Sequence, residues 1–289
     1  MTVSIIIVNY NGSAYTRQCL ESLTLLTGGT EVIVVDNAST DGSKELLPQL
    51  FPSVRFHWLK ENRGFGFANN RGAEAATGDL LFFLNNDTVI QSDILPELTG
   101  MFAKDQQCGI VAPKLLNRDG TFQLSFGDFP VIRTEMNARS LARDAGSARV
   151  LEPKDSVPVK KDWVTGAALL IRRGLFSRIG GFDERFFMYF EDSDLCRRVS
   201  NTGHTVWYCP AVSLIHFGGS SYGKKDARIA VEYRRSQLLY YRKHNSILQR
   251  VMLALFLIVK HAPRLLQPTE RKTAWRIIYM TVSADVTAS

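Results

Sequence analysis

Acidic side chains follow two apolar runs of this 289-residue chain. Asp36 comes directly after EVIVV, and Asp87 comes two asparagines after LLFFL. A carboxylate at the end of a buried strand suits a hard cation such as Mg²⁺ or Mn²⁺, which can bridge diphosphate oxygens. It can also accept hydrogen bonds from a nucleobase or a ribose. A structural role is the alternative for both, because Asp also caps helices, and positions 86–92 could form one around Asp87.

Three carboxylates stand close together in FMYFEDSDLCRR, at 187–198. They are Glu191, Asp192 and Asp194. Like charges so near one another raise the pKa of at least one group, and a carboxylate tuned in this way can act as a general base. Acids in the first turn of a helix, answered by the two arginines that follow, are the structural alternative.

A single histidine, His216, precedes two glycines in LIHFGGSSYG. A lone His is more often structural than a metal ligand, so a metal role requires a fold that places it near Asp87. The segment 218–221 could close over phosphates with its backbone N–H groups, or it could be an ordinary flexible loop.

These residues need a frame that brings distant positions together, and strands and helices alternate over residues 3–84. Strands are expected at Val3–Val8, Glu31–Val35, Val54–Leu59 and Leu80–Leu84, and helices at Tyr15–Leu26, after 39–42 and at Ala68–Ala76. Such alternation predicts a parallel sheet covered by helices, with ligands beyond the carboxyl ends of the strands. The polar residues at those ends are Asn9, Asp36, Asn62 and Asp87.

The second half of the chain is less regular. Residues 117–160 are expected to form a long excursion over the surface. Beyond it we expect strands at Trp163–Ile171 and Thr205–Tyr208 and helices at Leu175–Ile179, Asp192–Thr202 and, almost without interruption, Arg228–His261.

Composition indicates a globular protein, because 45% of the residues are hydrophobic and 22% are charged. The four cysteines form no CxxC pair and have no His at zinc-ligand spacing, so we expect reduced thiols in the cytosol. The N-terminal segment has no basic region and only a short apolar run, unlike a signal peptide, so we expect the chain to begin inside the cell.

Positive charge is concentrated at the C-terminus. Residues 228–289 hold eleven Lys and Arg against three Asp and Glu, a net charge of +8, so the residues before them carry −1 in all. This distribution predicts a local anionic partner and no nucleic-acid binding. The apolar run Val251–Val259 is far below the roughly 20 residues of a membrane span. Its basic flanks predict a helix lying in a membrane interface; packing on the preceding domain or a dimer contact is the alternative.

Seven segments, in order and spacing, resemble glycosyltransferase family 2, the inverting enzymes of the GT-A fold. They are SIIIVNYNG at 4–12, VIVVDNASTDGS at 32–43, ENRGFGFANNRG at 61–72, GDLLFFLNNDT at 78–88, WVTGAALLIRR at 163–173, GGFDERFFMYFEDSDLCRR at 180–198 and HFGGSS at 216–221. The resemblance implies an α/β fold with a Rossmann-like nucleotide-binding sheet, helices on both faces and a mixed sheet in the acceptor half. It implies a GT-A domain at 1–227, with a nucleotide-sugar half at 1–115 and an acceptor half at 116–227, followed by a basic amphipathic helical tail at 228–289.

The resemblance also implies residue roles. Nucleotide-sugar binding falls to Val8, Tyr10, Asp36, Asn62, Gly64 and Asn86. Asp87 and His216 would hold a divalent cation, Mg²⁺ or Mn²⁺, and Asp192 would be the general base. Trp163, Gly166 and Glu191 would lie near the acceptor. The chain departs from the family at Asn85, where many members carry the first Asp of the D-x-D motif, so the metal site has one negative charge fewer.

The pattern around Asp192 is most similar to rhamnosyltransferases of cell-surface polysaccharide assembly. This implies a dTDP-rhamnose donor, a lipid-linked or polysaccharide acceptor, and an enzyme peripheral on the inner face of the cell membrane. A transferase for another UDP-, GDP- or dTDP-sugar is the first alternative, and an inactive, membrane-docked sugar-binding partner is the second. A nucleotidyltransferase lacks its Gly-rich basic loop, and an oxidoreductase lacks a GxGxxG after the first strand.

Overall fold

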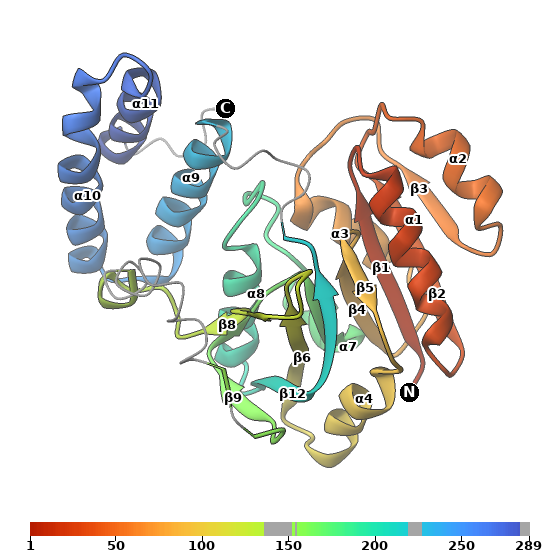
Figure 1. Cartoon of the computed structure of the whole chain (residues 1–289). Helices are drawn as coiled ribbons and strands as arrows, with labels where there is room; N and C mark the ends of the chain where they lie inside the picture. The colour runs from red at the N-terminus through yellow and green to blue at the C-terminus, as the bar shows by residue number, and fades with distance from the viewer. Residues whose placement is uncertain (136–151, 154, 219–226, 284–289) are drawn as a thin grey trace.

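A mixed sheet of ten strands forms the centre of the described structure (Figure 1). The computed structural model describes residues 1–135, 152–153, 155–218 and 227–283. Along the sheet the strands lie in the order β3-β2-β1-β4-β11-β6-β12-β5, with β7 beside β6 and β9 beside β12. The sheet therefore runs through both of the predicted halves of the catalytic domain.

The first four of these strands in the chain are parallel neighbours, as the sequence predicts. They are β1 (Val3–Asn9), β2 (Thr30–Asp36), β3 (Arg55–Trp58) and β4 (Leu80–Asn85). The intervening segments are α1 (Ser13–Ser22) with its short extension η1 (Leu23–Leu25), α2 (Ser43–Leu50) and α3 (Phe65–Ala75). The side chains of β1 and β4 are buried on both faces, which is why these strands read as unbroken apolar runs.

The second part of the sheet mixes strand directions. There β11 (Ala168–Arg172) lies antiparallel between β4 and β6 (Cys108–Leu116), and β12 (Thr205–His216) is parallel to β6. The remaining pairings add β7 (Phe122–Gln123) to β6 and β9 (Val159–Lys161) to β12. The predicted mixed sheet in this half is confirmed.

Within the first 227 residues, the helix considered as an alternative around Asp87 and one predicted strand differ from the structure. Residues 86–92 form no helix, because Thr88–Ile90 is a strand, β5, that pairs with β12. The strand expected at Trp163–Ile171 is interrupted: β10 (Trp163–Val164) pairs with β8 (Phe126–Gly127), and β11 begins at Ala168. The interruption turns residues 165–167 out of the sheet and leaves the Gly166 N–H available to another partner.

Helices cover both faces of the sheet, as predicted. One face packs against α1 and α4 (Leu95–Lys104), through Leu20, Leu98 and Phe102 among others. The other packs against α3, α7 (Arg173–Arg178) and α8 (Glu191–Asn201), through Ala68, Phe176 and Leu195 among others. Alternate residues of the strands supply the two cores.

The C-terminal region forms separate helices instead of the single long one predicted. They are α9 (Ala227–His244), α10 (Ile247–His261), the short η2 (Ala262–Leu266) and α11 (Arg271–Val282). The break falls at Ser246, whose hydroxyl accepts a hydrogen bond from the Gln249 N–H and so caps α10. In Figure 1, α10 and α11 lie beyond α9 on the side away from the parallel strands. None of the described helices combines the length and apolarity that a membrane crossing requires.

These helices have a core of their own that also contains catalytic-domain residues. Leu253, Leu257 and Ile277 pack in it with Phe186 and Phe190, from the loop before α8. The packing that the sequence left as an alternative to membrane binding is therefore present on one side of the tail.

Candidate functional site

A single cavity of about 1660 Å³ brings together nearly all of the predicted site residues. It lies beyond the carboxyl ends of β1 and β4 and is bounded by α8 and α9. The residues of the prediction that line it are Val8, Tyr10, Asn62, Gly64, Asn86, Asp87, Trp163, Gly166, Glu191, Asp192 and His216. Asp36 is not among its lining residues.

The Asp36 carboxylate forms hydrogen bonds inside the protein and does not line the cavity. It is only 4% exposed and accepts hydrogen bonds from Asn9 Nδ2 at 2.7 Å and from the Ser39 N–H at 2.8 Å. Its neighbour Asn37 lines the cavity instead and donates to Asn62 Oδ1 at 2.8 Å. The nucleotide role of Asp36 stays a prediction; in this structure its carboxylate orders the loop that presents Asn37.

Asn86 lines the cavity, but its amide nitrogen already has partners below. Nδ2 donates to Asn9 Oδ1 at 3.2 Å and to Thr16 Oγ1 at 3.0 Å. Asn86 can therefore contact a nucleotide sugar through its side-chain oxygen and its backbone. Gly64 next to Asn62 is required sterically, because it has φ +94° and a Cβ there would lie 2.3 Å from the Phe187 carbonyl oxygen.

Strand pairing brings Asp87 and His216 together. β5 pairs with the end of β12, so that Thr88 faces His216, and the Phe217 N–H donates to the Asp87 carbonyl at 2.9 Å. As a result His216 Nε2 lies 3.3 Å from Asp87 Oδ1. The condition that the sequence set for a metal role of His216 is thus met by the fold.

A relay of amides, which the sequence did not reveal, fixes the tautomer of His216. Backbone carbonyls can only accept, so the carbonyls of Phe122 and His216 require nitrogens beside them. Asn117 Nδ2 lies 3.4 Å from the first, and Gln123 Nε2 lies 3.4 Å from the second and donates to Asn117 Oδ1 at 2.9 Å. Gln123 Oε1 must then accept, and it lies 2.6 Å from His216 Nδ1. Nδ1 therefore carries a proton, and when the ring is neutral its Nε2 presents a lone pair.

A protonated His216 would form an ion pair with Asp87, whereas a neutral one places two acceptor atoms 3.3 Å apart, Nε2 of His216 and Oδ1 of Asp87. A shared cation stabilises such a pair, and a carboxylate oxygen with an imidazole nitrogen is a donor set that Mn²⁺ or Mg²⁺ can use. Among the described residues, Asn85 Nδ2 is a hydrogen-bond donor near that lone pair, at 3.3 Å from His216 Nε2. No group of three or more His, Cys, Asp or Glu suited to a metal occurs in the described part of the chain, so a cation here would complete its shell with substrate oxygens or water.

Asp192 stands in the first turn of α8, behind a strained bend. Tyr189 and Phe190 have left-handed φ values of 70° and 66°, which cost energy in residues other than Gly and are typical of functional sites. The bend starts α8 at Glu191 and aims Asp192 at the interruption between β10 and β11. There the Gly166 N–H donates to Asp192 Oδ2 at 3.1 Å, and the Ser193 N–H donates to Oδ1 at 2.6 Å.

Burial tunes the two neighbouring acids. It raises the pKa of Asp192 above its ordinary value, although the hydrogen bonds from Gly166 and Ser193 partly offset it. Burial, reinforced by the charge of Asp192, raises the pKa of Glu191 well above its ordinary value. Glu191 Oε2 has no hydrogen-bond partner among the residues that the structure describes. A carboxylate of raised pKa at a cavity wall is a suitable proton acceptor, and Glu191 is the more readily protonated of the pair.

Asp194 does not line the cavity. Its carboxylate is fully buried and lies 2.7 Å from Arg198, Lys243 and His244. Burial alone would raise the pKa of Asp194, but the hydrogen bond from His244 and the charges of Arg198 and Lys243 lower it below its ordinary value. Because Lys243 and His244 belong to α9, Asp194 ties α8 to the C-terminal helices. The sequence offered a structural alternative for these acids, in which first-turn carboxylates pair with the following arginines. Asp194 does pair with Arg198, but it also pairs with residues of α9.

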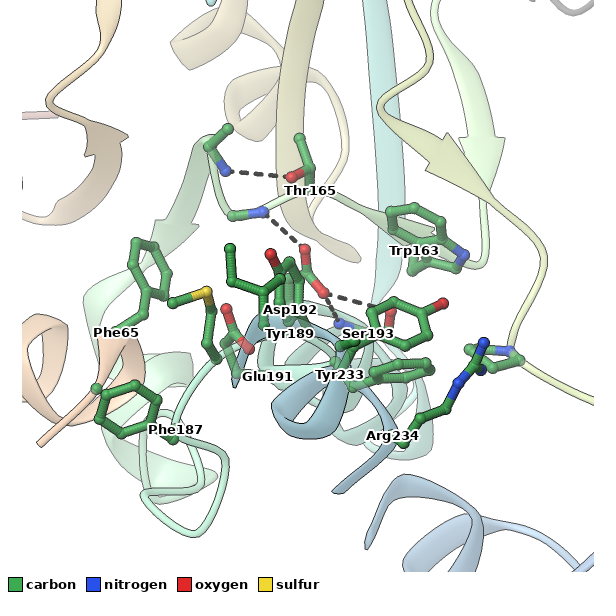
Figure 2. A pocket seen from close by; sticks show the side chains of 18 of the residues that line it. Phe65, Trp163, Thr165, Phe187, Tyr189, Glu191, Asp192, Ser193, Tyr233 and Arg234 are labelled. Carbon is green, nitrogen blue, oxygen red and sulfur yellow. Dashed lines mark hydrogen bonds between the residues drawn. The ribbon is translucent and has the colours of Figure 1, made fainter. Parts of the chain in front are cut away.

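Aromatic and basic side chains form the other side of the cavity. Figure 2 shows Asp192 between Phe65 and Phe187 on one side and Trp163, Tyr233 and Arg234 on the other. The Trp163 indole is held by a hydrogen bond to the Asp128 carbonyl at 2.9 Å. Tyr233 and Arg234 come from α9 and had no signal in the sequence beyond their place in a basic tail. Of the segment 218–221, which could bind phosphates or form an ordinary loop, residues 219–221 lie outside the described residues.

The sequence model of the family described as "Glycosyl transferase family 2" matches residues 4–148. Among curated proteins, N-acetylglucosaminyl-diphospho-decaprenol L-rhamnosyltransferase of Mycobacterium tuberculosis is 29% identical over 256 residues, covering 82% of this chain and 82% of the relative. The rhamnosyltransferase WbbL of Escherichia coli is 30% identical over 228 residues, covering 74% of this chain and 83% of the relative.

Solved structures share the fold at low sequence identity. GalNAc-T7, solved with UDP, GalNAc and Mn²⁺, has a TM-score of 0.67 and 15% identity, covering 99% of this chain and 57% of its own. This chain thus spans little more than half the length of that structure. The mannosyltransferase PcManGT from Pyrobaculum calidifontis, solved with GDP-Man and Mn²⁺, has a TM-score of 0.58 and 18% identity, covering 97% of this chain and 70% of its own. These likenesses confirm the predicted α/β architecture.

Proposed function

The chain belongs to glycosyl transferase family 2 and is a glycosyltransferase, and from this premise we propose that it moves a sugar from a nucleotide-diphosphate donor onto a hydroxyl of a lipid-linked or polysaccharide acceptor, with inversion at the anomeric carbon. One observation carries the proposal: the predicted metal pair, Asp87 and His216, and the predicted base, Asp192, line the same cavity. A donor diphosphate at the first and an acceptor hydroxyl at the second fit an in-line displacement.

Rhamnose from dTDP-rhamnose is the proposed donor sugar. The support is the similarity to proteins named rhamnosyltransferases over most of this chain. The donor side of the cavity, with Val8, Tyr10, Asn37 and Asn62, offers amide groups for a pyrimidine base and a tyrosine ring beside it. These groups would bind uracil as well as thymine. A binding experiment must therefore decide between a dTDP-sugar and a UDP-sugar.

Asp87 and His216 are the residues that would hold the divalent cation. When bound, the cation would neutralise the charge that develops on the leaving diphosphate. The nitrogen ligand and the single carboxylate distinguish this site from one made of two carboxylates. The lower negative charge leaves more of the cation's charge for the diphosphate.

The proton of the acceptor hydroxyl would pass to Asp192. The hydrogen bonds from Gly166 and Ser193 fix the carboxylate against the cavity wall while it waits for the acceptor. Its raised pKa makes it a stronger base than an exposed aspartate. The attacking oxygen then forms its bond to the anomeric carbon as the bond to the diphosphate breaks on the opposite face.

We also propose that the C-terminal helices rest on an anionic membrane surface at the inner face of the cell membrane. The face of α10 that does not pack is aliphatic and open, with Leu248, Val251, Leu255 and Val259 between 49% and 73% exposed. On α11 the exposed rings of Trp275 and Tyr279 stack 5.2 Å apart beside Arg271, Lys272 and Arg276. Apolar and aromatic residues beside cations are typical of interfacial helices.

Vesicle binding tests the membrane part of the proposal. Leu255→Glu, a charge placed on the open face of α10, should move the protein from the pellet to the supernatant when it is sedimented with vesicles rich in anionic lipid. Leu46→Glu, on exposed α2, is the matched control. Equal pelleting of wild type and both variants would count against this surface.

A panel of nucleotide sugars tests the donor. The purified protein is incubated with dTDP-, UDP- and GDP-sugars, with and without Mn²⁺, and its thermal midpoint is measured. A ligand at a hundredfold excess over its Kd stabilises the native state by about 2.7 kcal/mol, which is readily detected. Stabilisation by dTDP-rhamnose that requires the metal supports the proposal, and selective stabilisation by another nucleotide sugar replaces rhamnose as the donor.

A further inference from the structure

The bend that precedes α8 needs support from outside itself. Tyr189 and Phe190 both have left-handed φ values there, which cost energy in residues other than Gly and persist only where the surroundings hold them. Asp192 follows two positions later, in the first turn of the helix. Because α8 starts directly after the bend, a change in these backbone angles would redirect the Asp192 carboxylate. The contacts that hold the bend are therefore also contacts that aim the proposed base.

One face of α9 packs against this bend. Tyr233, Ser236 and Tyr240 are spaced by three and four positions, so they lie on the same side of the helix. Tyr233 packs edge-on against Tyr189 and Phe190, at ring distances of 5.5 and 5.2 Å, and the Tyr240 ring lies 5.7 Å from that of Phe190. The rings bury the bend, but ring contacts alone do not fix the orientation of a peptide group.

Ser236 makes a hydrogen bond to the bend itself. Its hydroxyl donates to the Met188 carbonyl at 2.7 Å, and the residue is only 1% exposed. A serine hydroxyl inside a helix commonly bonds a carbonyl of its own preceding turn, whereas this one bonds another segment. The Met188 carbonyl belongs to the peptide that leads into Tyr189, so the hydrogen bond fixes the plane of that peptide. The carbonyl before it, that of Phe187, accepts from the Phe65 N–H at 2.9 Å, so the bend is held from two sides.

Other contacts keep α9 itself in place. Lys243 and His244, near its end, lie 2.7 Å from the Asp194 carboxylate of α8, and the helix shares a core with α10 and α11. Alanine also has a higher helix propensity than serine. Removing the Ser236 hydroxyl should therefore leave α9 folded and docked, so that the loss falls on the bend.

We propose that Ser236 is a positioning residue for sugar transfer, which holds the bend before α8 in the conformation that presents Asp192 to the acceptor. The inference rests on the proposed function, because it concerns the aim of the base. Ser236 is not among the residues that line the cavity, so it acts through the Met188 carbonyl and not on the substrate. A helix of the C-terminal region thereby contributes to the geometry of the base as well as to the cavity wall.

Kinetics in two backgrounds tests this role. A misplacement of about 1 Å at a reacting group can cost on the order of a hundredfold, so Ser236→Ala should lower kcat by roughly tenfold, with the Kd of the nucleotide donor unchanged. In the Asp192→Asn background the same change should lower the residual rate by less than about twofold, since the group being positioned is already gone. Thr281→Ala is the matched control, because its hydroxyl bonds the Ile277 carbonyl within α11, and it should leave kcat unchanged.

Amide hydrogen exchange gives a readout that does not need catalysis. The Gly166 N–H donates to Asp192 Oδ2 at 3.1 Å, so its exchange rate reports whether the carboxylate is in place. This amide should exchange faster in Ser236→Ala than in wild type. The amides of β11, which begins two residues later, should not change, because the sheet is not disturbed.

Three results would overturn the proposal: an unchanged kcat in Ser236→Ala, an equal fold loss with and without Asp192→Asn, or unchanged exchange at Gly166. The second of these would mean that Ser236 serves only the stability of the fold. A wild type that transfers sugar to no acceptor defeats the proposed function instead. The exchange at Gly166 then still decides whether Ser236 holds Asp192 in place.

Discussion

Replacing Asp192 by Asn is the sharpest test of the catalytic assignment. The change keeps the size of the side chain but removes its ability to take the acceptor proton at neutral pH. General-base catalysis contributes roughly 10²–10⁴-fold, so kcat should fall by at least about a hundredfold, which corresponds to about 2.7 kcal/mol of transition-state stabilisation. The Kd of the nucleotide donor should change little, because the residues proposed to hold the metal and the nucleotide are other residues of the cavity wall.

The structure also predicts a smaller cost to stability in the same variant. Both carboxylate oxygens accept from backbone N–H groups, of Gly166 and of Ser193. An amide has one oxygen, so its NH₂ group must face one of these donors, and one hydrogen bond is lost. Leaving a buried donor unsatisfied costs about 1–3 kcal/mol, which should lower the thermal midpoint without preventing folding.

The pH dependence gives a second readout. The base must be ionised, and its pKa is raised, so kcat of the wild type should fall with decreasing pH at a value above the 3.8 of an ordinary aspartate. The Asn variant should have no such limb in the residual rate. The assay measures steady-state transfer across pH and donor affinity by titration. Turnover within tenfold of wild type, or loss of donor binding along with turnover, would refute the assignment of Asp192 as the base.

The other predictions concern the metal pair and the link to α9. Asp87→Ala should abolish the Mn²⁺-dependent part of nucleotide binding in isothermal titration; unchanged affinity would mean that Asp87 holds no cation. Gln123→Leu frees the His216 ring and should weaken Mn²⁺ affinity by roughly tenfold or more, whereas Gln106→Leu on the exposed surface should not. Asp194→Asn removes a buried carboxylate that pairs with Arg198 and Lys243, of which Lys243 keeps Asp183 as a partner, and should destabilise the fold by about 3–5 kcal/mol in denaturant unfolding, with transfer by the folded fraction intact. Since the pKa of Asp194 is lowered, its stabilisation is present above 3.8, the ordinary value, and fades as the pH falls further; a wild type and variant with the same acid transition would contradict this.

The first half of the molecule could be predicted almost entirely from the sequence. The strands β1, β2 and β4 are buried on both faces, so they read as apolar runs, and their carboxyl ends collect polar side chains at one edge. The residues that form the local pattern are there also the candidate site residues. The motifs around Asp87, Asp192 and His216 likewise pointed to the cavity that the structure contains.

Short strands and bends could not be predicted, because long-range pairing decides them. The segment after Asp87 has good turn and cap residues, yet it pairs with the end of β12 and becomes a strand. That pairing, and no local preference, puts His216 beside Asp87. The left-handed pair Tyr189 and Phe190 is also costly in isolation and persists only because the surrounding packing holds it.

The composition of the second side of the cavity was decided by tertiary structure alone. Gln123 matters because it lies 2.6 Å from an imidazole ninety-three positions away, and Arg234 because α9 folds back against α8. Asp194 is indistinguishable from Asp192 in a list of acids, but two positions along the helix, about half a turn, separate a carboxylate at the cavity wall from one buried among cations. The sequence determined which chemical groups are available and which strands must be buried. The contacts between distant segments determined which of those groups meet, since hydrogen bonds and ion pairs act over only a few ångströms.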